Sequence, residues 1–277
     1  MAKPAGPTSH DVVDAARRAL GTRRIGHLGT LDPFAAGLLV LVVGRATRLA
    51  PFAAGWMKTY EGVIRLGTTT ATDDASGDVV ATAEGWRTLD RGRVAAALAA
   101  LRGARLQRPP AYSAVKVAGE RAYRRARRGE AVDLAPRPVE VRELELTRFE
   151  PPDAGFRATV SAGTYVRSLA REAGAALGCG AHLAALVRTR VGPFRLEDAV
   201  EPEGVTPADL RDPAALVADL PRRQLDEPAR AAVIHGRPLP AGKVEGGRVA
   251  LFAGEQLIAV AELVGDVLKP RVVVAEP

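Results

Sequence analysis

The sequence predicts an α+β protein, in which a large domain with a mixed or antiparallel sheet and flanking helices precedes a small β-rich module. Strand-like and helix-like segments are interleaved over about the first 200 of the 277 residues. The composition then shifts to Pro, Asp and Ala over residues 202–221, which indicates a linker. Short β-patterned runs, RVALF, LIAVAEL and RVVVAE, follow between residues 222 and 277.

Local patterns predict the elements of the first half. The letters TSHD resemble a capping box and open a helix over residues 8–21. The apolar run GLLVLVVG, residues 37–44, predicts a strand buried on both faces, and KTYEGVIRLG, residues 58–67, predicts a second strand. Asp90 is expected to cap a helix that extends to Gly103.

The second half is expected to hold a proline-bearing loop, two helices, two strands and a helical turn. In chain order these are the loop RLQRPPAYSAVKVAG (105–119), the basic helix ERAYRRARR (120–128), strands at 137–149 and 156–162, a helix at 165–177 and a helical turn at 182–186. A turn at Pro151-Pro152-Asp153 joins the two strands.

Positive charge is concentrated in one part of the chain. The net charge is +7, but residues 102–128 contain nine basic residues and one acidic residue. This segment alone therefore carries +8, and the rest of the chain carries −1. A local basic patch suggests a polyanionic partner, most often nucleic acid, although a solvated basic face accounts for the charge equally well.

Composition also excludes several classes of protein. The single Cys179 rules out an internal disulfide framework and a multi-cysteine zinc site, and it suits a reducing cytoplasm. The first residues contain no secretory h-region, and the longest apolar run is too short to span a bilayer. No histidine pair has HxxxH spacing, and neither a P-loop nor a G-x-S-x-G elbow occurs. Among these kinds of site, one that uses a carboxylate without a metal is the remaining candidate.

One candidate carboxylate is Asp32, in the glycine-rich stretch RRIGHLGTLDPFAAG. An Asp-Pro pair is commonly a plain turn, and by itself Asp32 is more readily explained in that way. Gly26 and Gly29 change the balance, because glycines allow the backbone to approach a ligand closely. They leave Asp32 little covered, as a carboxylate that must reach a bulky substrate requires.

Two further motifs offer partners for this carboxylate. In GTYVR, Tyr165 follows a strand and opens a helix, so it is either a core tyrosine or a site residue. Arg167 lies two residues later, and its guanidinium is well shaped to hold a carboxylate such as Asp32. In KTY, Tyr60 is either a core residue or a ring that stacks on an unstacked base.

Taken together, five segments resemble successive signatures of the TruB-type tRNA pseudouridine synthases. They are GHLGTLDPFAAGLLVLVVGRATR, KTYEGVIRLGTTTATDDASGDVV, PPAYSAVKVAGERAYRRARRGE, SAGTYVRSLAREAG and GCGAHLAALVRTRVGPF. They occur in the order and spacing of the family, and the resemblance covers roughly residues 3–200. The tail is similar to a PUA-type RNA-binding module, with a weaker signal.

The resemblance implies a role for each matching residue. Asp32 matches the catalytic aspartate, Tyr60 the tyrosine that stacks on the target base, and Arg167 the arginine that pairs with the aspartate. The resemblance also implies a set of substrate-binding positions: Lys3, the loop-stabilising His27, Asp74 of the tyrosine–arginine network, the active-site Tyr165, the apolar Leu186, and Arg124, Arg125 and Arg128 of the basic segment.

The resemblance further implies what the protein does. Members isomerise a uridine of the tRNA T-loop, position 55 by tRNA convention, to pseudouridine, by flipping the base out and rearranging its glycosidic bond with an aspartate. The expected partner is the tRNA T-arm; no cofactor, metal or membrane is expected, and the protein is expected to be a cytoplasmic monomer. The alternatives are a non-catalytic RNA-binding or RNA-folding protein and a glycosidase that releases uracil.

The expected domains are a catalytic domain over residues 1–205, with a basic RNA-binding insertion at 102–130, and a PUA-like domain over 222–277. One departure from the family concerns the N-terminus. Members usually have an apolar strand and an acidic residue before the Lys-Pro of KPAG, whereas only Met1 and Ala2 precede Lys3 here. We therefore expect that strand either to be missing or to lie ahead of Met1.

Overall fold

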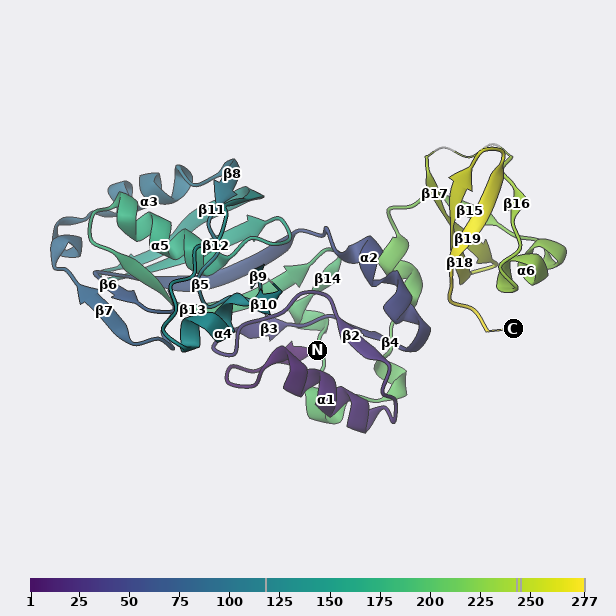
Figure 1. Cartoon of the computed structure of the whole chain (residues 1–277), viewed down its shortest axis with the longest axis horizontal. Helices are drawn as coiled ribbons and strands as arrows, with labels where there is room; N and C mark the ends of the chain where they lie inside the picture. Colours follow the sequence, from purple (N-terminus) through teal and green to yellow (C-terminus); the bar gives the residue numbers. More distant parts are fainter. Residues whose placement is uncertain (118, 243, 245, 277) are drawn as a thin grey trace. The chain divides into compact units, whose positions relative to one another are not determined.

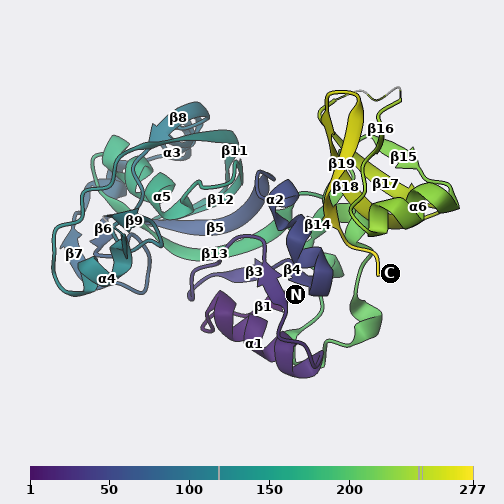
Figure 2. The ribbon, with the colours of Figure 1, turned by 45° about the vertical axis from the view of Figure 1, so that its right-hand side comes forward.

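The computed structural model describes residues 1–117, 119–242, 244 and 246–276. The chain forms two compact units, whose elements are labelled in Figures 1 and 2. The first unit comprises Met1–Thr8, Leu31–Leu38 and Trp56–Ala199, and the second comprises Ser9–Thr30, Leu39–Gly55 and Val200–Pro277. Each unit is therefore assembled from segments that are distant in sequence.

The first unit is built on a mixed sheet that has eight strands within the described residues. These are β1 (Ala2–Lys3), β3 (Ala36–Leu38), β5 (Lys58–Leu66), β8 (Gly103–Gln107), β11 (Arg137–Glu150), β12 (Asp153–Val160), β13 (Ala181–Val191) and β14 (Phe194–Arg195). Their order is β1-β3-β13-β5-β12-β11-β8, with β14 paired to β13. β13 is parallel to β3 and antiparallel to β5, so the middle of the sheet joins three segments far apart in sequence.

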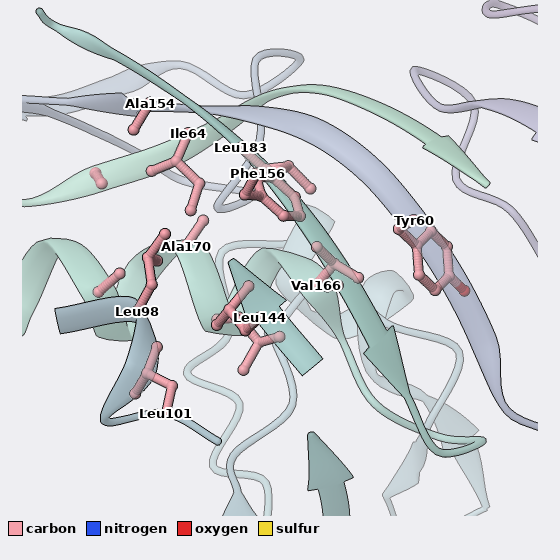
Figure 3. Close-up of a cluster of buried hydrophobic side chains, with 14 of the residues drawn as sticks. Tyr60, Ile64, Leu98, Leu101, Leu144, Ala154, Phe156, Val166, Ala170 and Leu183 are labelled. Atoms are coloured by element: carbon pink, nitrogen blue, oxygen red, sulfur yellow. The ribbon is translucent and has the colours of Figure 1, made fainter. Parts of the chain in front are cut away.

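Two helices, α3 (Arg91–Ala99) and α5 (Val166–Ala176), pack against this sheet. Figure 3 shows the apolar side chains of the strands and helices gathered between them, including Ile64, Phe156, Leu98 and Ala170. All four are at most 2% exposed, and burial of such side chains is the main stabilising contribution to the unit. The expected cap of α3 is confirmed, because Asp90 Oδ1 accepts a hydrogen bond from the Arg93 amide at 2.8 Å.

Smaller elements of the first unit lie in its loops. β6 (Thr68–Thr70) pairs with β7 (Val79–Thr82), and the 3₁₀ helix η2 (Gly85–Thr88) follows. β9 (Lys116–Val117) pairs with β10 (Glu120–Arg121), which leads into the short basic helix α4 (Ala122–Arg127). The unit ends near the 3₁₀ helix η3 (Leu196–Asp198).

The second unit contains α1 (Ser9–Ala19), the antiparallel pair β2 (Ile25–His27) and β4 (Leu41–Val43), and a C-terminal module. Short helical pieces connect them: η1 (Gly44–Leu49), α2 (Ala50–Ala53), η4 (Pro202–Gly204), η5 (Pro207–Asp209) and η6 (Pro213–Val217). The module consists of β15 (Arg222–Gln224), α6 (Glu227–Ile234), β16 (Leu239–Pro240), β17 (Arg248–Ala253), β18 (Gln256–Val264) and β19 (Val267–Val273). Its sheet has the order β15-β17-β18-β19-β16 and its own apolar core.

Most elements with a strong local signal are confirmed. The predicted helices at 8–21, 90–103 and 165–177 correspond to α1, α3 and α5, and the basic helix corresponds to α4. The strands at 58–67, 137–149 and 156–162 correspond to β5, β11 and β12. The N-terminal strand is not wholly missing, because Ala2 and Lys3 pair with Leu38 and Gly37 at the sheet edge.

Two predictions were wrong because long-range pairing overrode local propensity. Residues 182–186 were expected to form a helical turn, but they belong to β13 in the middle of the sheet. The run 37–44 was expected to be one strand, but it is divided between β3, which pairs with β13, and β4, which pairs with β2. Gly37, with φ +111°, lies so close to β13 that a Cβ there would meet Arg188 O at 2.4 Å.

Two smaller expectations also need correction. The loop expected at 105–119 contains the end of β8 and all of β9, because Gly103–Gln107 pairs along β11. Ala118 of that loop lies outside the described residues. The C-terminal module is not entirely β, since α6 forms part of its core. No helix in the described part of the chain is long and apolar enough to cross a membrane.

Candidate active site

Asp32 lies in a tight turn that is fixed from several sides. Its carbonyl accepts a hydrogen bond from the Ala35 amide at 3.1 Å. The ammonium of Lys3, a residue only 2% exposed, donates to Pro33 O at 3.3 Å and to Ala35 O at 2.6 Å. Leu31 and Ala35 on either side of the turn are buried in the apolar core. The Asp32 side chain, by contrast, remains 36% exposed, so that a ligand can reach it.

Arg167 holds this carboxylate through two of its nitrogen atoms. Nη2 donates to Asp32 Oδ1 at 3.1 Å, and Nε lies 2.9 Å from Oδ2. Arg167 is the second residue of α5, and its side chain is only 5% exposed. The guanidinium presents a planar fork that matches a carboxylate. The predicted pairing of Asp32 with Arg167 is therefore present in the structure.

The rest of the guanidinium is held by two loops of the same unit. Nη1 donates to Thr72 O at 2.9 Å and lies 3.3 Å from Asp74 Oδ2, and Nη2 also donates to Tyr112 O at 3.0 Å. Asp74 is itself buried, and its Oδ1 accepts from the Thr72 hydroxyl at 2.7 Å and from the Ser76 amide at 2.9 Å. Arg167 therefore has little freedom to turn away from Asp32.

The electrostatic balance at Asp32 favours its protonated form more than in water. Burial raises the pKa of Asp32 above its usual value, and the nearby charge of Asp74 adds to that rise. Arg167 and Lys3 act in the opposite direction, but burial has the larger effect. A carboxylate with a raised pKa is a stronger base and nucleophile when it is ionised. This property suits a group that forms a covalent bond or takes up a proton during a reaction.

Tyr60 and Leu186 line the same apolar cluster as Leu31 next to Asp32. Tyr60 lies on β5 towards one end of the cluster (Figure 3), and Leu186 lies on β13 opposite Gly62. The Tyr60 hydroxyl is hydrogen-bonded by Arg188, whose charge lowers the pKa of the phenol. Burial outweighs this contact, and the pKa of Tyr60 is raised above its usual value.

The other predicted site residues lie in several places. Tyr165 is the N-cap of α5, and its amide and carbonyl are both bonded by the buried Gln107 side chain. His27 lies in the second unit, on β2 opposite Leu41. Arg125 and Arg128 pair with Glu130, and Arg128 also pairs with Glu120. These assignments to substrate binding stay predictions, as does that of Arg124.

Several groups of the site were missed from the sequence. The carbonyl oxygens of Thr72 and Tyr112 leave no signal there, because any residue type supplies one. Arg188 is completely buried on β13, where its Nε donates to Leu38 O at 2.8 Å. If residues 182–191 had been recognised as a strand, Arg188 would have stood out as a charged residue in an otherwise apolar part of the sequence. In the described part of the chain, no cluster of three or more His, Cys, Asp or Glu residues could hold a metal ion.

The mixed sheet carries a partly exposed carboxylate that is held by a buried arginine, with a tyrosine in the neighbouring apolar cluster. Sequence comparison identifies the family of the chain. Residues 17–166 match the N-terminal domain of the TruB family pseudouridylate synthases, and residues 167–227 match the tRNA pseudouridylate synthase B C-terminal domain. The chain belongs to the TruB family, whose function is the isomerisation of uridine to pseudouridine in tRNA.

Relatives and solved structures agree with this assignment. The chain is 47% identical to the tRNA pseudouridine synthase B of Thermobifida fusca, over 99% of this chain and 96% of that protein. It is 44% identical to that of Mycobacteroides abscessus, over 93% and 89%. Among solved structures it is similar to a chain of an H/ACA RNP bound to a substrate RNA containing 2'-deoxyuridine, with a TM-score of 0.74 and 25% identity over 99% of this chain and 84% of that one. It is also similar to a chain of a Cbf5-Nop10-Gar1 complex, with a TM-score of 0.71 and 28% identity over 100% and 82%.

Proposed function

We propose that this protein converts uridine 55 in the T-loop of tRNA to pseudouridine, with Asp32 as the catalytic residue. The observation that supports this most directly is the fixed pairing of Asp32 with Arg167, next to the apolar cluster of Tyr60 and Leu186. The site combines one exposed carboxylate edge with an apolar wall. The planar, uncharged base of a nucleotide fits such a wall, whereas a charged group placed against it would lose its hydration without a partner.

The target uridine must leave its stack before Asp32 can reach it. Flipping a base costs a few kcal/mol, and stacking on protein side chains offsets that cost. We propose that the Tyr60 ring and Leu186 enclose the flipped uracil. Since Arg188 and the core fix Tyr60, its ring is already in place before RNA binds, which reduces the entropy lost on binding.

The reaction breaks the bond between N1 and C1′ and forms a bond between C5 and C1′, after which C5 loses its proton. Asp32 must be ionised to begin, whether it attacks the sugar, adds to the base or removes a sugar proton. The sequence left these three routes open. Because the pKa of Tyr60 is raised, a smaller fraction of its phenol is ionised at neutral pH than for a tyrosine in water, so less phenolate is present to accept the C5 proton.

We propose that residues 102–130 form the RNA-binding insertion that contacts T-arm phosphates. The ion pairs divide its arginines into two groups. Arg102, Arg105, Arg108, Arg125 and Arg128 pair respectively with Glu145, Glu172, Asp133, Glu130 and Glu120. Around Tyr123, in contrast, the nearby Arg124 and Arg121 lower the pKa of the phenol, and the Arg127 guanidinium lies 5.6 Å from the ring centroid. An aromatic ring among cations is suited to RNA, which offers phosphates and base faces together.

Further parts of the proposal concern organisation. We propose a catalytic domain over residues 1–205, a PUA-like RNA-binding domain over 222–277, and a cytoplasmic monomer. His27 is proposed to act at the RNA interface as a family position, whereas Lys3 is only 2% exposed, so we propose that its part in substrate binding is indirect. The Lys3 ammonium, with its backbone contacts around Pro33, also stabilises the turn that presents Asp32.

The test is to incubate the protein with unmodified tRNA and map pseudouridine at single-nucleotide resolution. We expect pseudouridine at position 55 with the wild-type protein. We expect Asp32→Asn to bind tRNA with unchanged affinity and to lose about 10²–10⁴-fold or more in rate, since the reacting group is gone. Asp153→Asn is the matched control, because Asp153 is in an exposed ion pair with Arg65.

The outcomes separate the competing functions. Full activity of Asp32→Asn would contradict the catalytic role of Asp32. Tight tRNA binding without pseudouridine would favour the non-catalytic RNA-binding or RNA-folding protein, which the family relationship does not favour. Release of free uracil would indicate a glycosidase. Release of tritium from 5-tritiated uridine in tRNA provides an independent measure of the isomerisation.

A further inference from the structure

A second arginine of α5, Arg171, lies one helical turn after Arg167. Residues four apart on a helix share one face, so both side chains extend in the same direction. Arg171 forms an ion pair with the Asp73 carboxylate, and its Nη2 donates to Arg108 O at 2.9 Å. The two arginines therefore contact the same two segments, residues 72–74 and residues 108–112, at neighbouring points.

Asp73 occupies an unusual backbone conformation between two groups that hold Arg167. Its φ is +61°, and no other non-glycine residue in the described part of the chain has a positive φ. Thr72 supplies a carbonyl to Arg167 and Asp74 supplies a carboxylate, so the torsion angles of Asp73 determine whether both can face the guanidinium. Left-handed backbone is unfavourable for most residues with a Cβ; Asp and Asn tolerate it better than the others, but neighbouring contacts are still needed to favour it over the common conformations.

The contacts that enforce it come from β13 and from Arg171. The Leu183 amide donates to Asp73 O at 3.0 Å, which fixes the backbone of the turn. The Asp73 side chain is 16% exposed and that of Arg171 33%, so water competes little for the carboxylate. Burial raises the pKa of Asp73, and the charge and hydrogen bond of Arg171 lower it, as expected of a carboxylate held by that arginine. Glycine would adopt this φ more easily but would offer Arg171 no partner.

We propose that Asp73 and Arg171 are positioning residues, which hold the 72–74 turn in the left-handed conformation that lets Arg167 grip Asp32. This inference depends on the proposed catalytic role of Asp32. Neither residue is expected to touch the substrate. Their effect passes through Arg167, so their loss should alter the state of Asp32 more than the affinity for RNA.

The test uses three variants of the full-length protein with tRNA. Asp73→Asn keeps the size and the tolerance for positive φ but removes the charge. Asp73→Gly relieves the backbone and removes the side chain. Arg171→Gln removes the other partner. We expect each to lower the single-turnover rate of pseudouridine formation by about 10–100-fold, because small displacements of catalytic groups have effects of this size. The Kd for tRNA should change less than about twofold, well below the tenfold that corresponds to 1.4 kcal/mol.

A second readout distinguishes positioning from a general structural role. The charged groups that shift the pKa of Asp32 are Arg167, Lys3 and Asp74. If the ion pair between Arg167 and Asp32 weakens, the pKa of Asp32 rises further. The acid limb of the pH–rate profile then moves to higher pH. The double variant Asp73→Asn/Arg171→Gln should be no slower than either single variant, because both remove one interaction. Asp153→Asn, which breaks an exposed aspartate–arginine pair, should behave as wild type.

A wild-type rate and an unshifted acid limb in Asp73→Asn and Arg171→Gln would overturn the inference. If these variants slow pseudouridine formation equally but leave the acid limb of the pH–rate profile in place, the inference is also overturned, because the contact of Arg167 with Asp32 would then be unaffected. If Asp73→Asn fails to fold, Arg171→Gln and Asp73→Gly carry the same test. If the wild-type protein forms no pseudouridine in tRNA, the proposed function fails rather than the positioning role.

Discussion

Two arginine clusters of the first unit differ in almost every physical respect. Arg167 is 5% exposed and is held by two carboxylates and two backbone carbonyls from three separate segments. Arg128 is 51% exposed, and its partners, Glu120 and Glu130, lie within eight residues in sequence. A buried guanidinium whose partners come from the fold has its geometry fixed, whereas an exposed one exchanges partners readily with water and ions. We infer that the first cluster controls chemistry and that the second contributes charge.

The largest expected effect is that of removing the buried guanidinium. Arg167→Gln leaves Asp32 and Asp74 without their common cation, and breaking a buried ion pair in this way costs about 3–5 kcal/mol of unfolding free energy. The exposed edge of Asp32 reduces that cost. We also expect the rate of pseudouridine formation to fall about 10²-fold or more, since Asp32 is no longer held in position. Chemical denaturation and single-turnover kinetics measure the two effects.

Arg128→Gln is the matched control in the exposed cluster. We expect no measurable change in its thermal midpoint or in its single-turnover rate at saturating protein, because solvated pairs contribute little. Equal losses in the two variants would contradict the distinction between the clusters. Arg167→Lys adds a further comparison. Lysine retains the positive charge but cannot contact the two carboxylates and two backbone carbonyls at once. A wild-type rate in this variant would mean that only the charge is needed at that position.

The next effect concerns the salt dependence of tRNA binding. Arg121→Gln/Arg124→Gln removes two cations beside Tyr123, and neither forms an ion pair with a carboxylate of the described residues. If both contact phosphates, the slope of log K against log salt should become shallower by about 1.4–1.8. The charge-neutral variant Glu120→Gln/Arg128→Gln should leave the slope unchanged. Equal slopes for both variants and the wild type would place this surface away from the RNA.

The smallest expected effect is a shift in pH dependence. Because the pKa of Asp32 is raised and its ion is the reactive form, the rate should fall on the acid side at a pH above that at which an exposed aspartate titrates. Asp74→Asn removes a negative charge that raises the pKa of Asp32, so the acid limb should move to lower pH even if the maximal rate falls. A limb that stays in place or moves upward would mean that Asp74 does not act on Asp32 through its charge.

The parts of the site that could be predicted are those with a local signal. The motif GTYVR indicated a strand-to-helix junction, and Tyr165 and Arg167 do begin α5. KTY indicated a strand, and Tyr60 lies on β5. The assignment of residues 182–186 to a helical turn failed because β13 gains its hydrogen bonds from β3 and β5, whose residues lie more than a hundred positions away in sequence. Arg188 was missed with it.

The sequence by itself determined the residue types of the site, the elements with strong periodicity or caps, and the concentration of positive charge in residues 102–128. Only the tertiary structure decided which partners meet. Asp73 and Asp74 are adjacent, yet Asp74 pairs with Arg167 and Asp73 with Arg171, because a left-handed backbone turn separates their side chains. Asp32 and Arg167 are 135 residues apart, and no local rule joins them. Their contact depends on the sheet, which brings distant segments together and excludes water from the arginine that holds the reacting carboxylate.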